Sequence, residues 1–280
     1  MNRIVSLTEE VPNVHRLVIE APDVARKARP GHFAVVIPDE KGERIPLSLA
    51  DWDVDAGTVS IYFLEVGVST MKLARRRPGD EIDLMAPLGR PATIDRYGEV
   101  FVGGGCYGIG AIYPIVRALK EAGNCVVTAI EGRSGYLFYN QEALVAHSDD
   151  LHLATSDGSV GTKGKVQTVL WDLVKSGRSF DMAYFIGCTF MMMRASRTAA
   201  EFGIPCRVYL NPLMVDGTGM CGVCRVHIGG ETRFACVDGP EFDGALVDWE
   251  ELFSRSQQYV PHQTMAYQYK KCELGHCREV

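Results

Sequence analysis

The stretch Val100-Phe-Val-Gly-Gly-Gly-Cys-Tyr-Gly108 decides the fold. It opens with three apolar residues that predict a strand, and a helical periodicity follows from Ile112 to Ala122. A G-x-G-x-x-G pattern between a strand and a helix is typical of dinucleotide-binding loops, because glycines let the backbone turn tightly and approach a pyrophosphate at the helix N-terminus. The same glycines could also form an ordinary turn of an α/β domain. We expect nucleotide binding, by Gly103, Gly104, Gly105, Gly108, Ile109 and Gly110.

The segment from 97 to 210 continues the alternation that this stretch begins. Short apolar runs alternate with helical patterns and with turns that contain glycine. The predicted strands are 100–102, 125–130, 151–155, 182–186 and 206–210, and the predicted helices are 112–122, 165–175 and 191–201. Such alternation indicates a doubly wound parallel sheet. We therefore expect residues 97–210 to be an α/β domain that binds NAD(P).

Two charged residues leave the choice of nucleotide open. Glu131 ends the strand that follows the glycine loop, where a carboxylate can accept the 2′-hydroxyl of a ribose. Arg133 lies two residues later and could instead bind a 2′-phosphate. The pattern therefore does not decide between NAD and NADP.

Residues 1–96 have a different pattern of apolar residues, which favours strands over helices. Short alternating or apolar runs at 15–20, 33–37 and 59–64 predict strands, and glycine- or proline-containing turns separate them. Several short strands with little helical periodicity suggest a small antiparallel barrel.

Two segments of this barrel carry groups that suit a flavin nucleotide. In Arg44-Ile-Pro-Leu-Ser48 the cation and the hydroxyl share one face of a strand, so the arginine can clamp a diphosphate while the serine bonds a ring edge. Glu65-Val-Gly-Val-Ser-Thr70 offers a glycine turn and hydroxyls to a phosphate. Taken alone, either segment could be an ordinary strand or turn. The cofactor-binding residues expected here are Arg44, Pro46, Leu47, Ser48, Glu65, Val66, Gly67, Ser69 and Thr70.

A cysteine-rich segment follows the sheet domain. Asp216, Cys221, Cys224 and Cys236 form a D-x₄-C-x₂-C-x₁₁-C pattern separated by glycines. Structural zinc sites usually use two C-x-x-C or C/H knuckles, whereas this segment has one. Its spacing matches the C-x₄-C-x₂-C…C of plant-type [2Fe–2S] proteins with the first thiolate exchanged for a carboxylate. Aspartate before glycine is also a common turn former. We expect residues 211–250 to bind an iron–sulfur cluster through these four side chains.

Composition sets the broad class of the protein. The 280 residues are 46% hydrophobic and 23% charged with a formal net charge of −6, which gives no basic face for nucleic acid. The sequence has no run of about 18 apolar residues, so it predicts no membrane-spanning helix. The first residues lack the apolar core of a signal peptide, and nine cysteines in a reducing compartment favour metal binding or redox chemistry. We expect a cytoplasmic redox protein that inserts into no membrane.

The order of these motifs resembles the ferredoxin–NADP reductase superfamily of flavoproteins over roughly residues 1–210. Further landmarks are Pro30-Gly-His-Phe33, Pro87-Leu-Gly89 and the segment that runs from Asp157 to Gly164. The resemblance implies FAD on the barrel, with Arg44 on its phosphates and Ser48 near flavin N5, and a nicotinamide that stacks from the second domain. It also places Gly187 and Cys188 beside the nicotinamide, with Asp157 near the nucleotide. A buried small thiol is the alternative for Cys188.

A closer resemblance covers roughly residues 1–255. A flavin reductase followed by this cysteine loop is similar to the electron-transfer subunit of type B dihydroorotate dehydrogenase, which has four cysteine ligands. Asp216 departs from that pattern and resembles the small subunit of NADH-dependent reduced ferredoxin:NADP⁺ oxidoreductase, where one aspartate and three cysteines similarly hold the [2Fe–2S] cluster. The resemblance implies that FAD handles NAD(H) here, and that a larger flavin and iron–sulfur subunit completes an electron-bifurcating hetero-oligomer.

Other functions remain open at this point. The partner could be a dihydroorotate dehydrogenase, a sulfide- or polysulfide-reducing subunit, or a protein similar to glutamate synthase. From another class, the chain could be a non-catalytic NAD-sensing module with a zinc knuckle, although such a protein would not need the barrel motif. The tail, 251–280, is polar, with a helix expected near 249–256. Its Cys272 and Cys277 are either solvent-exposed thiols or groups that reach a metal or a partner.

Overall fold

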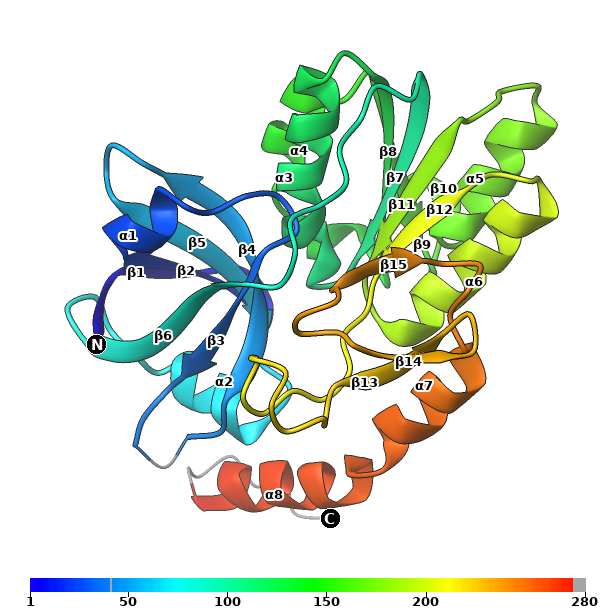
Figure 1. Ribbon diagram of the computed structural model, residues 1–280. Coiled ribbons are helices and arrows are strands. Elements are labelled where there is room, and N and C mark those ends of the chain that lie inside the picture. The colour runs from blue at the N-terminus through cyan, green and yellow to red at the C-terminus, as the bar shows by residue number, and fades with distance from the viewer. Residues whose placement is uncertain (41, 274–280) are drawn as a thin grey trace.

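A computed structural model describes residues 1–40 and 42–273 of the chain. The barrel and the sheet domain lie side by side, and the yellow and orange C-terminal segment lies where the two meet (Figure 1). In the residues described, no helix is both long enough and apolar enough to span a membrane. The predicted combination of an antiparallel barrel, a parallel sheet and a small C-terminal module is confirmed.

Six antiparallel strands close the N-terminal barrel in the order β1-β2-β5-β4-β3-β6. Alternating side chains point inward, and Leu17 and Ile61 face each other across β2 and β5, both without solvent exposure. The strands are β1 (Asn2–Val11), β2 (Val14–Glu20), β3 (Phe33–Ile37), β4 (Ile45–Asp53), β5 (Thr58–Leu64) and β6 (Glu81–Leu88), and the short helices are α1 (Pro22–Ala25) and α2 (Val68–Leu73).

The second domain is a seven-stranded sheet in the order β10-β9-β8-β7-β11-β12-β15. Every neighbouring pair is parallel except β12 and β15. Helices α3 and α4 cover one face and α5 and α6 the other. The strands are β7 (Glu99–Gly105), β8 (Cys125–Gly132), β9 (Asp150–Thr155), β10 (Thr162–Lys163), β11 (Met182–Ile186), β12 (Cys206–Tyr209) and β15 (Glu241–Asp243). The helices are α3 (Gly108–Glu121), η1 (Gly135–Leu137), α4 (Gln141–His147), α5 (Val166–Lys175) and α6 (Thr189–Glu201).

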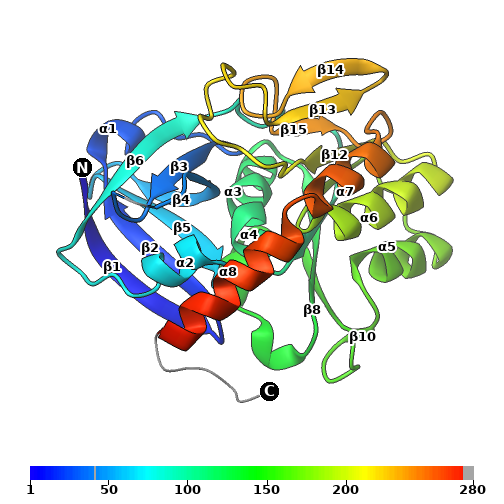
Figure 2. The same cartoon turned by 90° about the horizontal axis from the view of Figure 1, so that it is seen from below.

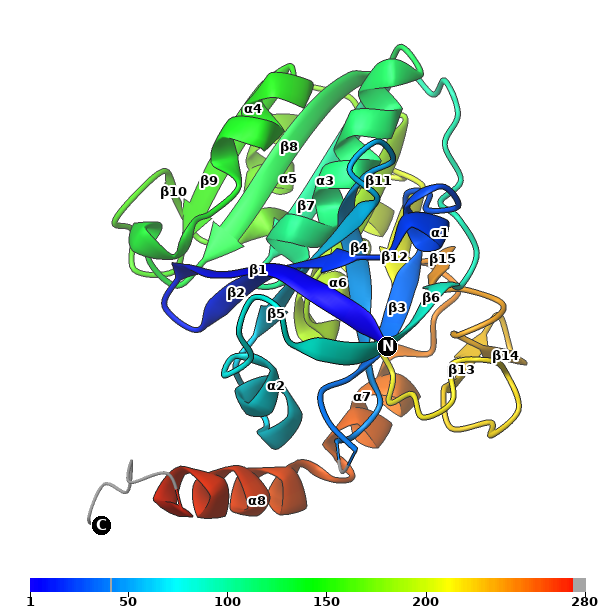
Figure 3. The same cartoon turned by 90° about the vertical axis from the view of Figure 1, so that its left-hand side faces the viewer.

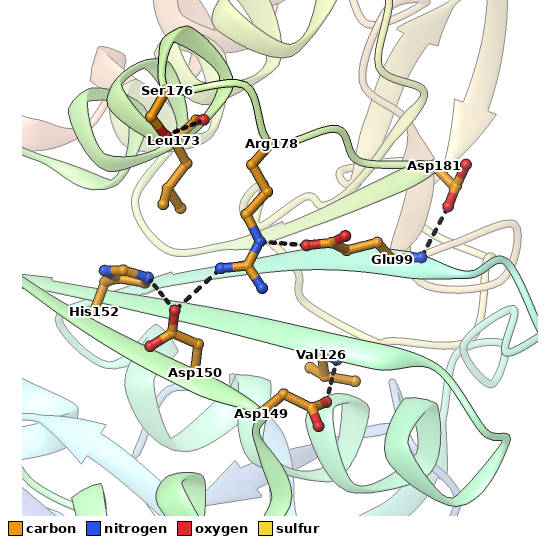
Figure 4. Close-up of polar contacts among 9 residues, drawn as sticks. All are labelled: Glu99, Val126, Asp149, Asp150, His152, Leu173, Ser176, Arg178 and Asp181. Carbon is orange, nitrogen blue, oxygen red and sulfur yellow. Dashed lines mark hydrogen bonds and ion pairs between the residues drawn. The ribbon is translucent and has the colours of Figure 1, made fainter.

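Charged side chains tie together the edge of the sheet where its strands begin (Figure 4). Arg178 donates to Glu99 at the start of β7 and to Asp150 at the start of β9, the latter at 3.1 Å. Asp150 also lies 2.9 Å from the imidazole of His152, and Asp181 accepts the backbone N–H of Glu99 at 2.8 Å. These polar groups hold one another in place. The opposite edge, where the strands end, carries the motifs that the sequence singles out.

The C-terminal segment joins both domains. The hairpin of β13 (Arg225–Ile228) and β14 (Glu231–Phe234) follows the loop of residues 216–224, which we call the cluster loop. Strand β15 then adds an antiparallel edge to the sheet. Helix α7 (Trp249–Gln257) matches the helix expected at 249–256. Helix α8 (Val260–Glu273) runs beneath the barrel toward α2 and buries none of its residues (Figures 2 and 3). Cys272 lies near the end of α8, and Cys277 lies outside the described residues.

The barrel packs on α3 through matched polar and aromatic contacts. A Cβ at Gly110 would lie 2.2 Å from the ring of Tyr62 in β5, so glycine permits this close approach. The ring of Tyr62 also packs against the tilted ring of Tyr139, whose hydroxyl accepts the N–H of Gly110 at 3.1 Å. Farther along α3, Arg117 pairs with Asp51 of β4 at 2.9 Å. These contacts hold the N-terminal barrel against the sheet domain.

We predict that His32, beside β3, makes folding pH-dependent. Its Nδ1 accepts the N–H of Arg29 at 3.1 Å, and burial, followed by the nearby Arg29 cation, lowers the pKa of the imidazole below 6.5. The unfolded chain therefore binds this proton more readily, and the free energy of unfolding should fall as the pH drops through about 6.5, by at most about 1.4 kcal/mol per pH unit. Urea unfolding of the wild type and of His32→Asn at pH 7.5 and 5.5 tests this. The Asn oxygen can replace Nδ1, so the variant should lose less stability; an equal loss in both contradicts the assignment.

Candidate functional site

The glycine loop ends β7 and begins α3 as the sequence predicts. The turn itself uses Cys106, whose φ of 53° is left-handed, and α3 starts at Gly108. A Cβ at Gly108 would lie 2.1 Å from the carbonyl oxygen of Ile186, at the end of the neighbouring strand β11. Only glycine allows α3 to begin so close to that backbone.

The other glycines of the motif are buried in packing. Gly103, Gly104 and Gly105 belong to β7, where a Cβ on the first would meet Val166 of α5 and a Cβ on the second would meet Ile112 of α3. Ile109 is buried in the core under α3. Which backbone N–H groups of this loop contact a nucleotide stays a prediction.

Glu131 is engaged within the fold. Its side chain is buried, one carboxylate oxygen accepts the N–H of Val166 at 2.8 Å, and the other lies 3.5 Å from the ammonium of Lys165. It therefore stabilises the first turn of α5. Its contact with a ribose stays a prediction, and a nucleotide would have to compete with these partners.

Arg133 and Asp157 come together at the ends of β8 and β9. Asp157 donates its backbone N–H to the carbonyl of Arg133 at 3.1 Å, and its carboxylate accepts the hydroxyl of Ser134 and the N–H of Ser159. Hydrogen bonds from Ser134 and then Ser159 lower the pKa of Asp157 to about 2. Both Arg133 and Asp157 are exposed, at the edge that also carries the glycine loop.

A pocket forms where barrel, sheet and C-terminal segment meet. Ser48, beside Phe33 across β3 and β4, lies on the barrel side together with Pro46 and Leu47. Tyr107 and Gly187 belong to the sheet domain, and Asn211 and Met214 begin the cysteine-rich segment. The pocket thus brings Ser48 and Gly187 together, and their contacts with a flavin and a nicotinamide stay predictions.

Tyr107 links the walls of this pocket. Its hydroxyl donates to the carbonyl of Gly187 at 3.0 Å and accepts the side-chain amide of Asn211. Thr189 donates to the same amide group at 3.2 Å. Burial, and then the nearby Cys188 thiol, raises the pKa of Tyr107, so the hydroxyl keeps its proton. Cys188 is exposed and precedes α6, beside the pocket. Sequence reasoning missed both Tyr107, which lies within the glycine motif, and Asn211, which begins the segment expected to bind the cluster.

The remaining barrel residues gather at one rim. Arg44 is exposed just before β4, and its neighbour Glu43 accepts the hydroxyl of Ser69 at 2.6 Å. Thr70 accepts the N–H groups of Val66 and Gly67, so both hydroxyls shape the turn into α2. Glu65 lies 3.4 Å from the buried His15 imidazole. The contact of this rim with a flavin phosphate stays a prediction.

The four expected cluster ligands stand in two close pairs. Cys221 Sγ lies 3.3 Å from a carboxylate oxygen of Asp216, and Cys224 Sγ lies 3.2 Å from Cys236 Sγ. Two ligands of one tetrahedral ion lie roughly 3.7 Å apart when each bond is about 2.3 Å, so each pair can hold one metal ion. Within residues 1–40 and 42–273, no single group of three or more His, Cys, Asp or Glu forms a metal site. The arrangement of two and two fits a two-iron cluster.

The loop directs backbone N–H groups at these ligands. Met220 and Cys221 donate to one oxygen of Asp216 at 3.1 and 3.0 Å, and Thr218 donates to the other at 3.1 Å. These bonds, the one from Thr218 first, lower the pKa of Asp216 to about 2, so it is a carboxylate. Burial, and next the neighbouring Cys224 thiol, raises the pKa of Cys236. As an iron ligand Cys236 would be a thiolate, so iron binding would release its proton.

The two pairs differ in exposure. Cys224 and Cys236 are 2% and 1% exposed and share a hydrophobic core with Phe33, Val35 and Met214. Asp216 and Cys221 lie at the surface side of the loop. The cluster loop is therefore packed against barrel strand β3, beside the pocket that contains Ser48.

Known proteins resemble both the cysteine-rich segment and the chain as a whole. Residues 211–248 match the model of the iron–sulfur cluster binding domain of dihydroorotate dehydrogenase B. The dihydroorotate dehydrogenase B (NAD⁺) electron transfer subunit homolog of Thermotoga maritima is 44% identical over 270 residues, covering 96% of this chain and 95% of its own length. The corresponding subunit of Desulforamulus reducens is 32% identical, covering 89% and 97%.

The chain belongs to the dihydroorotate dehydrogenase B electron transfer subunit family. A solved NADH-dependent reduced ferredoxin–NADP oxidoreductase structure, described as an insight into flavin-based electron bifurcation, is also similar, with a TM-score of 0.91 and 42% identity over 96% of this chain and 97% of that one. The predicted family resemblance is confirmed. Members of this electron transfer subunit family work as parts of an oxidoreductase complex, and this chain carries the iron–sulfur binding domain that such a role needs.

We predict that Asp216→Cys keeps the cluster of this electron transfer subunit but changes its properties. A thiolate can replace the carboxylate beside Cys221, because the loop glycines and N–H donors stay in place. Ligand identity is a lever on potential, so the electron paramagnetic resonance spectrum and the reduction potential should both shift while iron content stays the same. Unchanged spectra and potential in the iron-loaded variant would mean that Asp216 is a turn former and not a ligand.

Proposed function

We propose that this chain takes a hydride from NADH onto a barrel-bound FAD and passes single electrons through a [2Fe–2S] cluster to a larger flavoprotein subunit. The proposal is supported chiefly by the pocket lined by Ser48, Gly187 and Met214. This pocket joins the barrel, the sheet domain and the segment that precedes the cluster ligands. When bound, the flavin supplies the conversion from two-electron to one-electron chemistry.

The chain's own residues provide position in this scheme. Ser48 lies at the barrel wall of the pocket and can bond the edge of a flat ring. Gly187 and the protonated Tyr107 form the opposite wall. Arg44 at the barrel rim supplies a fork of donors for a diphosphate. No acid–base group is required, since a hydride transfer needs alignment above all.

The two ligand pairs suggest the path that electrons take from the flavin to the partner subunit. The buried pair, Cys224 and Cys236, shares its core with Phe33 on the barrel, so one iron would lie toward the flavin pocket. The pair of Asp216 and Cys221 lies at the surface, beside Met220, whose side chain is 88% exposed. A surface pocket of about 330 Å³ lined by Leu213, Val215 and Tyr259 lies next to this loop. We place the contact with the larger subunit on this side.

The ligand set favours one partner class over another. Asp216 in the first ligand position is the feature by which the chain resembles the small subunit of NADH-dependent reduced ferredoxin:NADP⁺ oxidoreductase. We therefore propose that the complex joins NADH, NADPH and ferredoxin by electron bifurcation. The second candidate is a dihydroorotate dehydrogenase complex, favoured by the match of residues 211–248 to that enzyme's cluster domain.

Anaerobic purification of the full chain together with the protein that accompanies it tests the proposal. We expect FAD, iron and sulfide in the complex, flavin-dependent oxidation of NADH with a viologen acceptor, and reduction of ferredoxin when NADPH is the donor and NAD⁺ is present. Dihydroorotate-dependent reduction of NAD⁺ would instead select the second candidate. Zinc without flavin would refute both and favour an NAD-sensing module.

A further inference from the structure

Two thiols lie where the strand order of the sheet changes direction. The chain runs from β7 outward through β8 and β9 and then returns to β11 on the other side of β7, so β7 and β11 flank the switch point of the sheet. Open α/β sheets bind ligands in the crevice at the carboxyl ends of such strands. Cys106 directly follows β7, and Cys188 lies two residues after β11. Both cysteines are free and exposed.

The register of β7 and β11 places these two cysteines level with each other. The last pair of the parallel ladder joins Ile186 to Gly104, and each cysteine lies two residues beyond that pair. The strand ends still touch one step further on, because a Cβ at Gly187 would lie 3.4 Å from the carbonyl oxygen of Gly105. Neighbouring strands lie about 4.8 Å apart, within the roughly 4.4–6.8 Å between Cα atoms that a disulfide spans.

The turn at Cys106 points to a use for its thiol. Its φ of 53° lies in the left-handed region, which glycine adopts without penalty and a side chain such as cysteine rarely adopts. The hydroxyl of Tyr139 donates to its carbonyl oxygen at 2.9 Å and so holds the turn in place. Desolvation by the surrounding loops, followed by the nearby Cys188 thiol, raises the pKa of Cys106. The two thiols therefore lie within electrostatic reach of each other.

We propose that Cys106 and Cys188 are an oxidative modification site, where hydrogen peroxide forms a disulfide that closes the crevice at the switch point. The bond would cross the crevice beside the pocket, because the lining residues Tyr107 and Gly187 are the chain neighbours of the two cysteines. This inference rests on the proposed function, since closing the crevice would regulate the proposed transfer of hydride from NADH.

The reaction consumes two thiols and one peroxide. The thiolate of Cys188 attacks a peroxide oxygen, the O–O bond breaks, and the hydroxide that leaves takes up a proton and becomes water. The thiolate of Cys106 then attacks the resulting sulfenic acid, the S–O bond breaks, and a second water leaves as the S–S bond forms. Two electrons pass from the thiol pair to the peroxide. We assign the first attack to Cys188 because it precedes α6, whose N-terminus stabilises negative charge. A dithiol reductant reverses the step by thiol–disulfide exchange.

Peptide mapping of the flavin-loaded full chain tests whether the bond forms. The anaerobic protein is treated with hydrogen peroxide, alkylated and digested with trypsin, which places the two cysteines in separate peptides, 97–117 and 179–194. We expect these peptides to be joined with the loss of two hydrogen atoms and to separate after treatment with dithiothreitol. Peptides that stay separate while other thiols of the chain are oxidised would overturn the inference.

Stopped-flow reduction of the flavin by NADH measures the consequence. Peroxide should slow this reaction in the wild type by about tenfold or more, and dithiothreitol should restore it. Cys106→Ser and Cys188→Ser, each compared with its own untreated form, should change by less than about twofold. Cys125→Ser is the matched control, because it removes an exposed thiol at the opposite edge of the sheet and should respond to peroxide as the wild type does.

The outcomes separate this inference from the proposed function. A disulfide that leaves flavin reduction unchanged, or a loss of rate in both Cys106→Ser and Cys188→Ser equal to that of the wild type, overturns the inference while the proposed function stands. An untreated wild type whose flavin is not reduced by NADH overturns both.

Discussion

Replacing Cys224 with alanine should abolish electron transfer to the partner subunit while leaving hydride transfer to the flavin intact. Cys224 is 2% exposed and lies 3.2 Å from Cys236, so its loss removes one of the two inner ligands. Changes in outer-shell partners of a metal site already cost 10- to 100-fold, so removal of a ligand should lower partner reduction by more than about 100-fold. The walls of the hydride pocket that carry Ser48 and Gly187 belong to the barrel and the sheet domain, so we expect little effect on hydride transfer.

The measurement combines iron and sulfide analysis, the electron paramagnetic resonance signal after reduction, and anaerobic stopped-flow reduction of the flavin by NADH. We expect the first two to fall to background and the third to stay within about twofold of wild type, which also shows that the variant is folded. Cys125→Ala is the matched control, since Cys125 is a thiol of the same chain at the far edge of the sheet. Full cluster content in Cys224→Ala would refute the ligand assignment.

Replacing Gly108 with alanine should have the second large effect, on the nucleotide half of the molecule. The new Cβ would lie 2.1 Å from the carbonyl oxygen of Ile186 and 3.0 Å from the Cα of Gly187. Both are backbone atoms, so relief requires β11 and α3 to move apart. We expect a loss of about 3 kcal/mol or more in the free energy of unfolding. NADH binding should weaken strongly, because the same shift displaces Gly187 in the pocket.

Thermal unfolding and NADH-dependent flavin reduction measure the two consequences. Gly177→Ala is the control, because its φ of 99° carries the left-handed penalty but a Cβ there meets nothing within 4 Å. That variant should lose about 1–2 kcal/mol and keep NADH binding. If Gly108→Ala behaves like Gly177→Ala, the close approach of α3 to β11 does not matter for the site.

The sequence predicts those parts of the fold whose signal is local. Strands 33–37 and 182–186 match β3 and β11, since short apolar runs between turns leave little choice. Helix α3 begins at Gly108 and not at Ile112, because glycines contribute nothing to hydrophobic periodicity. Strand β15 has three residues and forms only by pairing with β12, so no local pattern marks it. Helix α8 buries no residue and therefore has no apolar stripe to recognise.

In the candidate site, too, the sequence predicts the local features and misses the contacts between residues far apart in the chain. The ligand spacing of Asp216 and the cysteines is local: Asp216 pairs with Cys221 within one loop, and Cys224 pairs with Cys236 across the two ends of the β13–β14 hairpin. The engagement of Glu131 by Val166 and Lys165 depends on residues 34 and 35 positions away, so it follows only from the packing of α5 on the sheet. The link from Tyr107 to Asn211 joins two domains and is likewise invisible to motif spacing.

We propose that electrons from NADH reach the cluster within this chain, by way of the flavin. An anaerobic NADH titration of the cofactor-loaded full chain, followed by visible absorbance and electron paramagnetic resonance, tests it most directly. We expect bleaching of the flavin together with a signal from the reduced cluster, and no signal in flavin-free material. A flavin that bleaches while the cluster stays oxidised at every NADH concentration, or a cluster reduced equally well without flavin, would contradict it.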